Sequence, residues 1–158
     1  MERKFEEIKQ EILRRAHEAN ACKEQYGRAY KAEDMAGLCR VIKDNWNWCC
    51  IWNVVTPDLL EKYREEFAGQ LIYMNVDTDK GFLFASGNAT VRAWGNATVR
   101  AWDNATVEAS GNAYCTSYWI IECKLSEKAL YRVRSTNTVY FASDDLEFVK
   151  QDPTQQES

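Results

Sequence analysis

Cysteine and histidine are the side chains through which this chain could do nucleophilic or metal chemistry, and it has six cysteines and one histidine. A cysteine nucleophile needs a basic partner, but the apolar spacing around His17 puts it toward the polar side of a helix, beside Glu18. The adjacent Cys49 and Cys50 cannot both face one site on a helix. A zinc site would need widely scattered thiolates, because no two cysteines form a CxxC pair. We therefore expect reduced, mostly buried thiols at positions 22, 39, 49, 50, 115 and 123.

The remaining candidates for catalysis are weak. Asp144 and Asp145 form an acidic pair, but adjacent acids near the end of a chain are usually solvated. The glycines recur at regular intervals, whereas a phosphate-binding loop would place them just before a helix. The sequence therefore predicts a protein that is not an enzyme and that uses no cofactor and no metal ion.

The composition is that of a slightly acidic globular protein. Its 158 residues, 46% of them hydrophobic, suffice for one domain or two small joined pieces. The formal net charge of −4 argues against direct nucleic-acid binding, which usually needs a basic face. No apolar run approaches the roughly 20 residues of a membrane span, and the segment MERKFEEIKQ has no hydrophobic signal core. We expect a cytoplasmic protein that does not bind membranes.

Residues 1–70 show the three- and four-residue apolar spacing of helices. One stripe runs from Phe5 to Ala19, and residues 22–32 either continue that helix or form a second one broken near Gly27. Asp34 and Thr56 are each placed to cap a further helix, the latter directly before a proline. The helical spacing of Trp48, Ile51, Trp52 and Val55 puts these residues on one face. We therefore interpret Trp46, Trp48 and Trp52 as core residues.

Between positions 87 and 118 the chain repeats an eight-residue unit: GNATVRAW, GNATVRAW, DNATVEAS and GNAYCTSY. Each unit joins a two-residue turn signal to a six-residue β pattern, which is typical of a β-solenoid. In one fixed frame the octads begin at Asp79, and the last begins at Ser135. The fifth position of each octad reads Leu83, Val91, Val99, Val107, Cys115, Cys123, Tyr131 and Val139. The third and seventh positions are also small or apolar in most octads, so alternation predicts that these three columns face inward and the others face solvent.

Two observations favour two octads per coil over three. The inner residues of the clear copies are only Ala, Val and Ala, which fill a thin gap between two sheets but underfill a triangular core. A coil of two octads also stacks Arg92, Glu108 and Lys124 with alternating sign, whereas three octads would put Arg100 over Lys124. The asparagine after each Gly or Asp suits a left-handed corner, and these residues are Asn88, Asn96, Asn104 and Asn112.

The sequence thus predicts an α+β protein with two main parts. Residues 1–70 form a helical segment that caps residues 71–150, an octapeptide-repeat β-solenoid (β-helix), and residues 151–158 form a disordered tail. Aromatic residues near the solenoid corners lie close to arginines, a combination typical of protein interfaces. The candidate partner-binding residues are Arg92, Trp94, Arg100, Trp102, Tyr118, Trp119 and Arg134. In the structural alternative, these side chains only stack on one another and on the helices.

The NATV octads lie between the segments ANACKEQYGRAYKAED and VIKDNWNW on one side and IECKLSEKALYRVRSTNTVYFASDD on the other. Over nearly its whole length the chain resembles NATV-octapeptide-repeat proteins of uncharacterised function, encoded by gut bacteria of the Bacteroides type and by their phages and mobile elements. The resemblance implies a bacterial or phage cytosolic setting and supplies no activity, cofactor or site residues.

We therefore expect a non-enzymatic protein-binding or scaffold module. A sharper form of this hypothesis is a phage or mobile-element inhibitor of a host protein. The alternative is a binder of a small ligand or glycan that stacks on the solenoid aromatics. The identity of the protein partner and the formation of a homodimer stay open.

Overall fold

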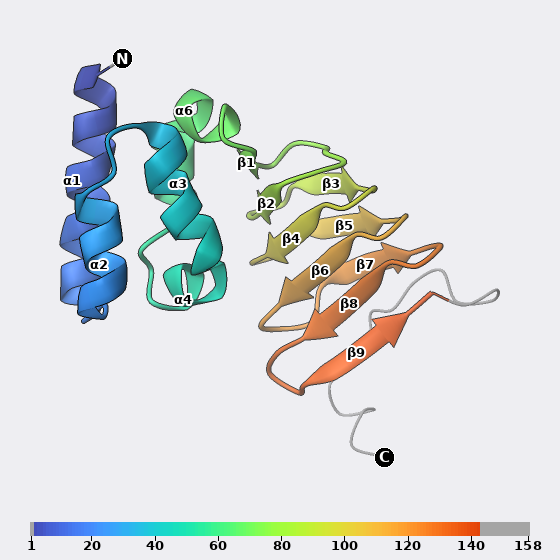
Figure 1. Ribbon diagram of the computed structural model, residues 1–158. Coiled ribbons are helices and arrows are strands. Elements are labelled where there is room, and N and C mark those ends of the chain that lie inside the picture. The colour runs from blue at the N-terminus through green and yellow to red at the C-terminus, as the bar shows by residue number, and fades with distance from the viewer. Residues whose placement is uncertain (1, 143–158) are drawn as a thin grey trace. The chain divides into compact units, whose positions relative to one another are not determined.

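Figure 1 shows the computed structural model, which describes residues 2–142. The chain divides between Gln70 and Leu71 into two compact units. The first unit consists of helices and the second of strands, which is the α+β class that the sequence predicts. The acidic pair Asp144–Asp145 and the tail 151–158 lie outside the described residues.

The helices of the first unit begin and end as follows: α1 Glu2–Glu18, α2 Lys23–Tyr30, α3 Met35–Asp44, α4 Trp46–Ile51, α5 Pro57–Lys62 and α6 Arg64–Ala68. Residues 22–32 therefore contain a second helix, and Gly27 does not break it. Both predicted caps are confirmed. The Asp34 carboxylate accepts a hydrogen bond from the Gly37 backbone N–H at 2.8 Å, and Thr56 Oγ1 accepts one from the Leu59 N–H at 3.3 Å.

The prediction of a tryptophan core after α3 is only partly right. Trp46 is buried and Trp48 is half-buried, but Trp52 is 57% exposed. The physical reason is that α4 ends at Ile51 and Asn53 takes a left-handed φ of 57°. The helical spacing therefore stops there, and the chain turns so that Val54 enters the core instead.

Up to residue 142, the second unit has the following short strands: β1 Ile72–Met74, β2 Phe82–Ala85, β3 Thr90–Ala93, β4 Thr98–Ala101, β5 Thr106–Ala109, β6 Tyr114–Ser117, β7 Glu122–Leu125, β8 Leu130–Val133 and β9 Thr138–Phe141. They form two sheets, a first sheet in the order β1-β2-β4-β6-β8-β9 and a second sheet in the order β3-β5-β7 (Figure 1). In the first sheet Leu83 pairs with Val99, and in the second Val91 pairs with Val107. Each pair is two octads apart, so the prediction of two octads per coil is confirmed.

The solenoid core lies between the two sheets. The fifth and seventh octad positions from Leu83 to Val133 are buried, which confirms their predicted inward orientation. The last octad departs from the repeat, because β9 turns back and pairs antiparallel with β8. Tyr140 is the buried residue of β9, while Val139 and Phe141 are 42% and 63% exposed. The prediction that Val139 faces inward is therefore wrong.

The left-handed residue of each regular corner is the first of its octad rather than the asparagine that follows it. These left-handed residues are Gly87, Gly95, Asp103, Gly111 and Glu127. At position 95 the lack of space explains the glycine, because a Cβ atom there would lie 2.5 Å from the backbone oxygen of Asp79. Trp119 occupies the same octad position without a positive φ, so its corner has a different shape.

Candidate functional site

The predicted surface residues are divided between the two edges of the solenoid. Corners that follow strands of the first sheet lie at one edge, and corners that follow strands of the second sheet lie at the other (Figure 1). Trp102, Tyr118, Trp119 and Arg134 belong to the first edge, and Trp94 belongs to the second. The seven candidates therefore cannot form one continuous patch.

Two octads with the same sequence, 87–94 and 95–102, place the same side chains in different surroundings. In the second sheet, the Arg92 side chain is 71% exposed and its Nε atom forms a 2.8 Å ion pair with Glu108. In the first sheet, Arg100 is only 2% exposed. Its guanidinium carbon lies 5.9 Å from the ring centroid of Trp102, which stacks on Phe84 at 4.5 Å. The expectation that Arg100 faces solvent is therefore wrong, and Trp102 is part of the packing.

Among the described residues of the solenoid, the most exposed pair of neighbouring aromatic rings lies at the corner formed by residues 118–121, here called the aromatic corner. Tyr118 is 50% exposed and Trp119 is 69% exposed. Their rings meet edge to face at 5.0 Å, and the Arg134 guanidinium carbon lies 5.8 Å from the Tyr118 ring centroid. Tyr118 and Arg134 also follow the paired strands β6 and β8, so they belong to neighbouring corners of the same edge. The aromatic corner therefore presents two rings, and Arg134 of the neighbouring corner lies beside one of them.

A buried relay of hydrogen bonds fixes the backbone of the aromatic corner. The Ile121 backbone N–H donates to Tyr131 Oη at 2.9 Å, and Ser117 Oγ donates to the Trp119 carbonyl oxygen at 2.7 Å. Tyr131 Oη and Ser117 Oγ are 2.6 Å apart. Because the serine hydrogen is already used, the tyrosine must be the donor between the two hydroxyls. Burial raises the pKa of Tyr131 well above its usual value, so the hydroxyl keeps this proton.

The sequence marked Tyr131 only as an inward residue, so this supporting role was missed. The aligned octads did contain a signal for this role. Tyrosine stands where the earlier copies have Val or Cys, and a buried phenol needs a hydrogen-bond partner.

The second edge carries a shallow hollow of about 320 Å³ beside Trp94, which is 44% exposed. Charged side chains of alternating sign and hydroxyl side chains line the hollow. The polar lining residues are Arg92, Glu108, Lys124, Ser110 and Ser126. This hollow combines one indole ring with several hydrogen-bonding groups.

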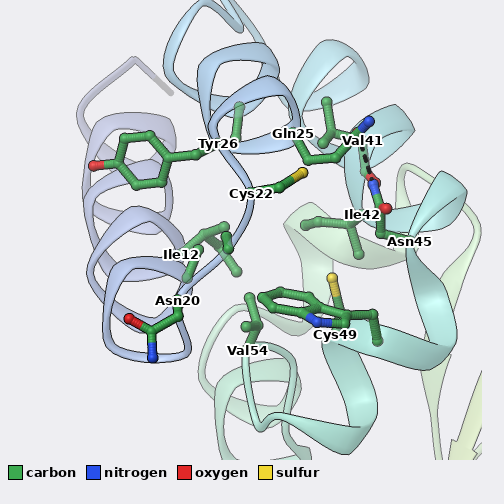
Figure 2. Close-up of a pocket in the computed structure, with 14 residues that line it drawn as sticks. Ile12, Asn20, Cys22, Gln25, Tyr26, Val41, Ile42, Asn45, Cys49 and Val54 are labelled. Carbon is green, nitrogen blue, oxygen red and sulfur yellow. Dashed lines mark hydrogen bonds between the residues drawn. The ribbon is translucent and has the colours of Figure 1, made fainter.

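The helical unit contains a cavity of about 270 Å³, shown in Figure 2. It is lined by residues from α1 to α4 and from the turns between them. Figure 2 shows Ile12, Ile42 and Val54 converging on this space, with the Cys22 sulfur directed toward it. Sequence reasoning missed the cavity, because an apolar stripe indicates which face is buried and not how completely the opposing faces fill the space.

The cysteines are arranged as buried thiols, with one exception. Cys22 is exposed, while the other five are buried and free. Burial raises the pKa of Cys39 and of Cys49 to about 12, so both are protonated at neutral pH. Within residues 2–142, no three side chains of His, Cys, Asp or Glu gather into a group that could hold a metal ion. In the same range, no helix has the length and apolar character to cross a bilayer.

Comparison of the chain with protein-family models, with curated proteins and with solved structures finds no match. The candidate sites therefore rest on their geometry alone.

Proposed function

We propose that this protein is a non-enzymatic binding module and that its aromatic corner contacts a protein partner. The observation that supports this most is the exposure of Tyr118 and Trp119 on a corner that departs from the repeat. Trp102, in the same column of corners, is instead packed on Phe84. A ring needed only for packing would be expected to bury its surface in that way. Exposed tryptophan and tyrosine beside arginine are the residues that most often anchor protein interfaces.

The rigidity of the aromatic corner supports the same proposal. The relay through Tyr131 and Ser117 holds the corner backbone from inside the core. Anchors that are already ordered before binding lose little conformational entropy when a partner docks. A cytoplasmic setting, and a host protein as the target of a phage or mobile-element chain, are further parts of the proposal that rest on the resemblance alone.

Site-specific photo-crosslinking in a bacterial host tests the proposal. p-Benzoylphenylalanine at Trp119 should give a discrete crosslinked protein, whereas the same residue at Trp94, an exposed tryptophan on the other edge, should not. Once the partner is identified, Trp119→Ala should weaken its binding about thirtyfold, as expected for an anchor that contributes about 2 kcal/mol. Trp94→Ala is the matched control. Equal crosslinking at both positions, or full binding by Trp119→Ala, would contradict the proposal.

A second candidate function, glycan binding, is favoured by the hollow beside Trp94. Sugars stack on exposed indole rings and hydrogen-bond to polar side chains around them, and Glu108 and Ser110 are placed for the second role. A glycan array, followed by titration of wild type and Trp94→Ala with each hit, distinguishes the two functions. A hit that Trp94→Ala abolishes and Trp119→Ala leaves unchanged would favour glycan binding over the first proposal.

A further inference from the structure

The cavity of the helical unit is partly open to solvent, and it is large enough to hold a small molecule. An engineered apolar cavity of about 150 Å³ is enough to bind benzene, and the cavity between α1 and α4 measures about 270 Å³. Its volume therefore matches a molecule somewhat larger than benzene, about the size of two fused rings.

The lining of the cavity specifies the chemistry of an occupant. None of the 14 lining residues is Asp, Glu, Lys, Arg or His, and most are apolar. The open space results partly from small side chains, because Ala16 and Ala29 are buried lining residues. Trp48 and Tyr26 add aromatic surface. The lining offers a charged ligand no counter-ion, so the cavity favours neutral apolar molecules.

Two side-chain amides at the edge of the lining, those of Gln25 and Asn45, are hydrogen-bonded to each other. Asn45 Nδ2 donates to Gln25 Oε1 at 3.0 Å and to the Val41 carbonyl oxygen at 2.9 Å. Gln25 Oε1 also accepts a hydrogen bond from Arg28 Nη1 at 2.8 Å. Figure 2 shows the bond between the two amides at the edge of the lining. These residues hold α2 and α3 together, so recognition inside the cavity depends on shape and apolar contact.

We infer that the helical unit binds a small, neutral, predominantly apolar molecule of about the size of a bicyclic aromatic ring. Cys22 lies at this cavity and is the only cysteine of the chain that is exposed. A molecule in the cavity should therefore shield the thiol from solvent. This site is separate from the aromatic corner and does not depend on the proposed protein partner.

Indole is a suitable probe, and indole-3-acetate is its charged control. Isothermal titration of the full chain should give saturable binding of one indole, with a dissociation constant below about 1 mM. The charged indole-3-acetate should bind at least tenfold more weakly. Ala29→Leu should fill the cavity and weaken indole binding at least tenfold, while Ala36→Leu, at an exposed position of α3 outside the cavity, should leave it unchanged.

Alkylation of Cys22 by iodoacetamide gives a second readout that needs no variant. Saturating indole should slow the reaction at least threefold in the wild-type chain and leave the rate in denaturant unchanged. This measurement decides the matter if Ala29→Leu does not fold. The inference is overturned if indole does not saturate the wild-type chain, if indole-3-acetate binds equally well, if a folded Ala29→Leu binds like wild type, or if indole leaves the Cys22 rate unchanged.

Discussion

Substitution of valine by alanine at two equivalent octad positions should have very different effects. Val107 and Val139 both occupy the fifth position of an octad. Val107 is fully buried on β5, the central strand of the second sheet, between Val91 and Cys123 in register. Val139 is 42% exposed, because β9 runs antiparallel and its inward residue is Tyr140. The repeat alone would assign both valines to the core.

The size of the difference can be estimated from the structure. Val107→Ala removes two buried carbon atoms, which costs about 1.6 kcal/mol in transfer free energy. The space they leave adds about 1 kcal/mol if the two sheets do not relax into it. We therefore expect Val107→Ala to lower the free energy of unfolding by about 2.5 kcal/mol. Val139→Ala should lower it by less than about 1 kcal/mol, because much of that side chain already contacts water.

Urea denaturation followed by circular dichroism measures both variants. With an m value of about 2 kcal/mol per molar urea, Val107→Ala should lower the midpoint by about 1 M, and Val139→Ala by less than about 0.5 M. Equal shifts of the two midpoints would falsify the antiparallel hairpin of β8 and β9. A change in slope without a change in midpoint would instead indicate that the two units unfold separately.

Three further predictions concern the hydroxyl relay, the thiols and the helical unit. Tyr131→Phe should lower the free energy of unfolding by about 1–3 kcal/mol, because Ile121 N–H and Ser117 lose their buried partner; an unchanged urea midpoint would refute the relay. At pH 8 a thiol-reactive dye should label Cys22 fast and the other five cysteines only in denaturant, because those five are buried and burial also raises the pKa of Cys39 and of Cys49; fast labelling of two or more would contradict this. Expression of residues 70–150 alone should give insoluble or oligomeric material, since we predict that the helices cover an open sheet end; a soluble β-rich monomer would show that no cap is needed.

The repeat predicted the solenoid well because each octad carries its own strand and corner signals. The inward columns follow from the alternation of small apolar and polar residues, and two octads per coil follow from the small size of the inner residues and the stacking of opposite charges. The prediction for the last octad is wrong because the direction of a strand is set by the preceding corner and by the strand with which it pairs. In a four-residue strand such as β9, the alternating pattern fits a parallel or an antiparallel strand, and the two directions place opposite sets of residues inward.

The sequence could not predict which of the candidate site residues are exposed. Residues 87–94 and 95–102 are identical, so no local rule can separate Arg92 from Arg100 or Trp94 from Trp102. Their exposure depends on which sheet each octad joins and on neighbours two octads away, such as Phe84. The cavity of the helical unit was hidden for a related reason, because its volume depends on the distances between four helices.

The same pair of identical octads limits how the length of this chain can change during evolution. Slippage between the DNA copies that encode them would add or remove eight residues, which is half a coil. Every later strand would then move to the other sheet, and the corner with Tyr118 and Trp119 would move to the opposite edge of the solenoid. A change of sixteen residues would keep every strand in its sheet and alter only the height of the stack. Functional variants of this protein should therefore differ in length by whole coils. Variants that have gained or lost an odd number of octads should be eliminated by selection.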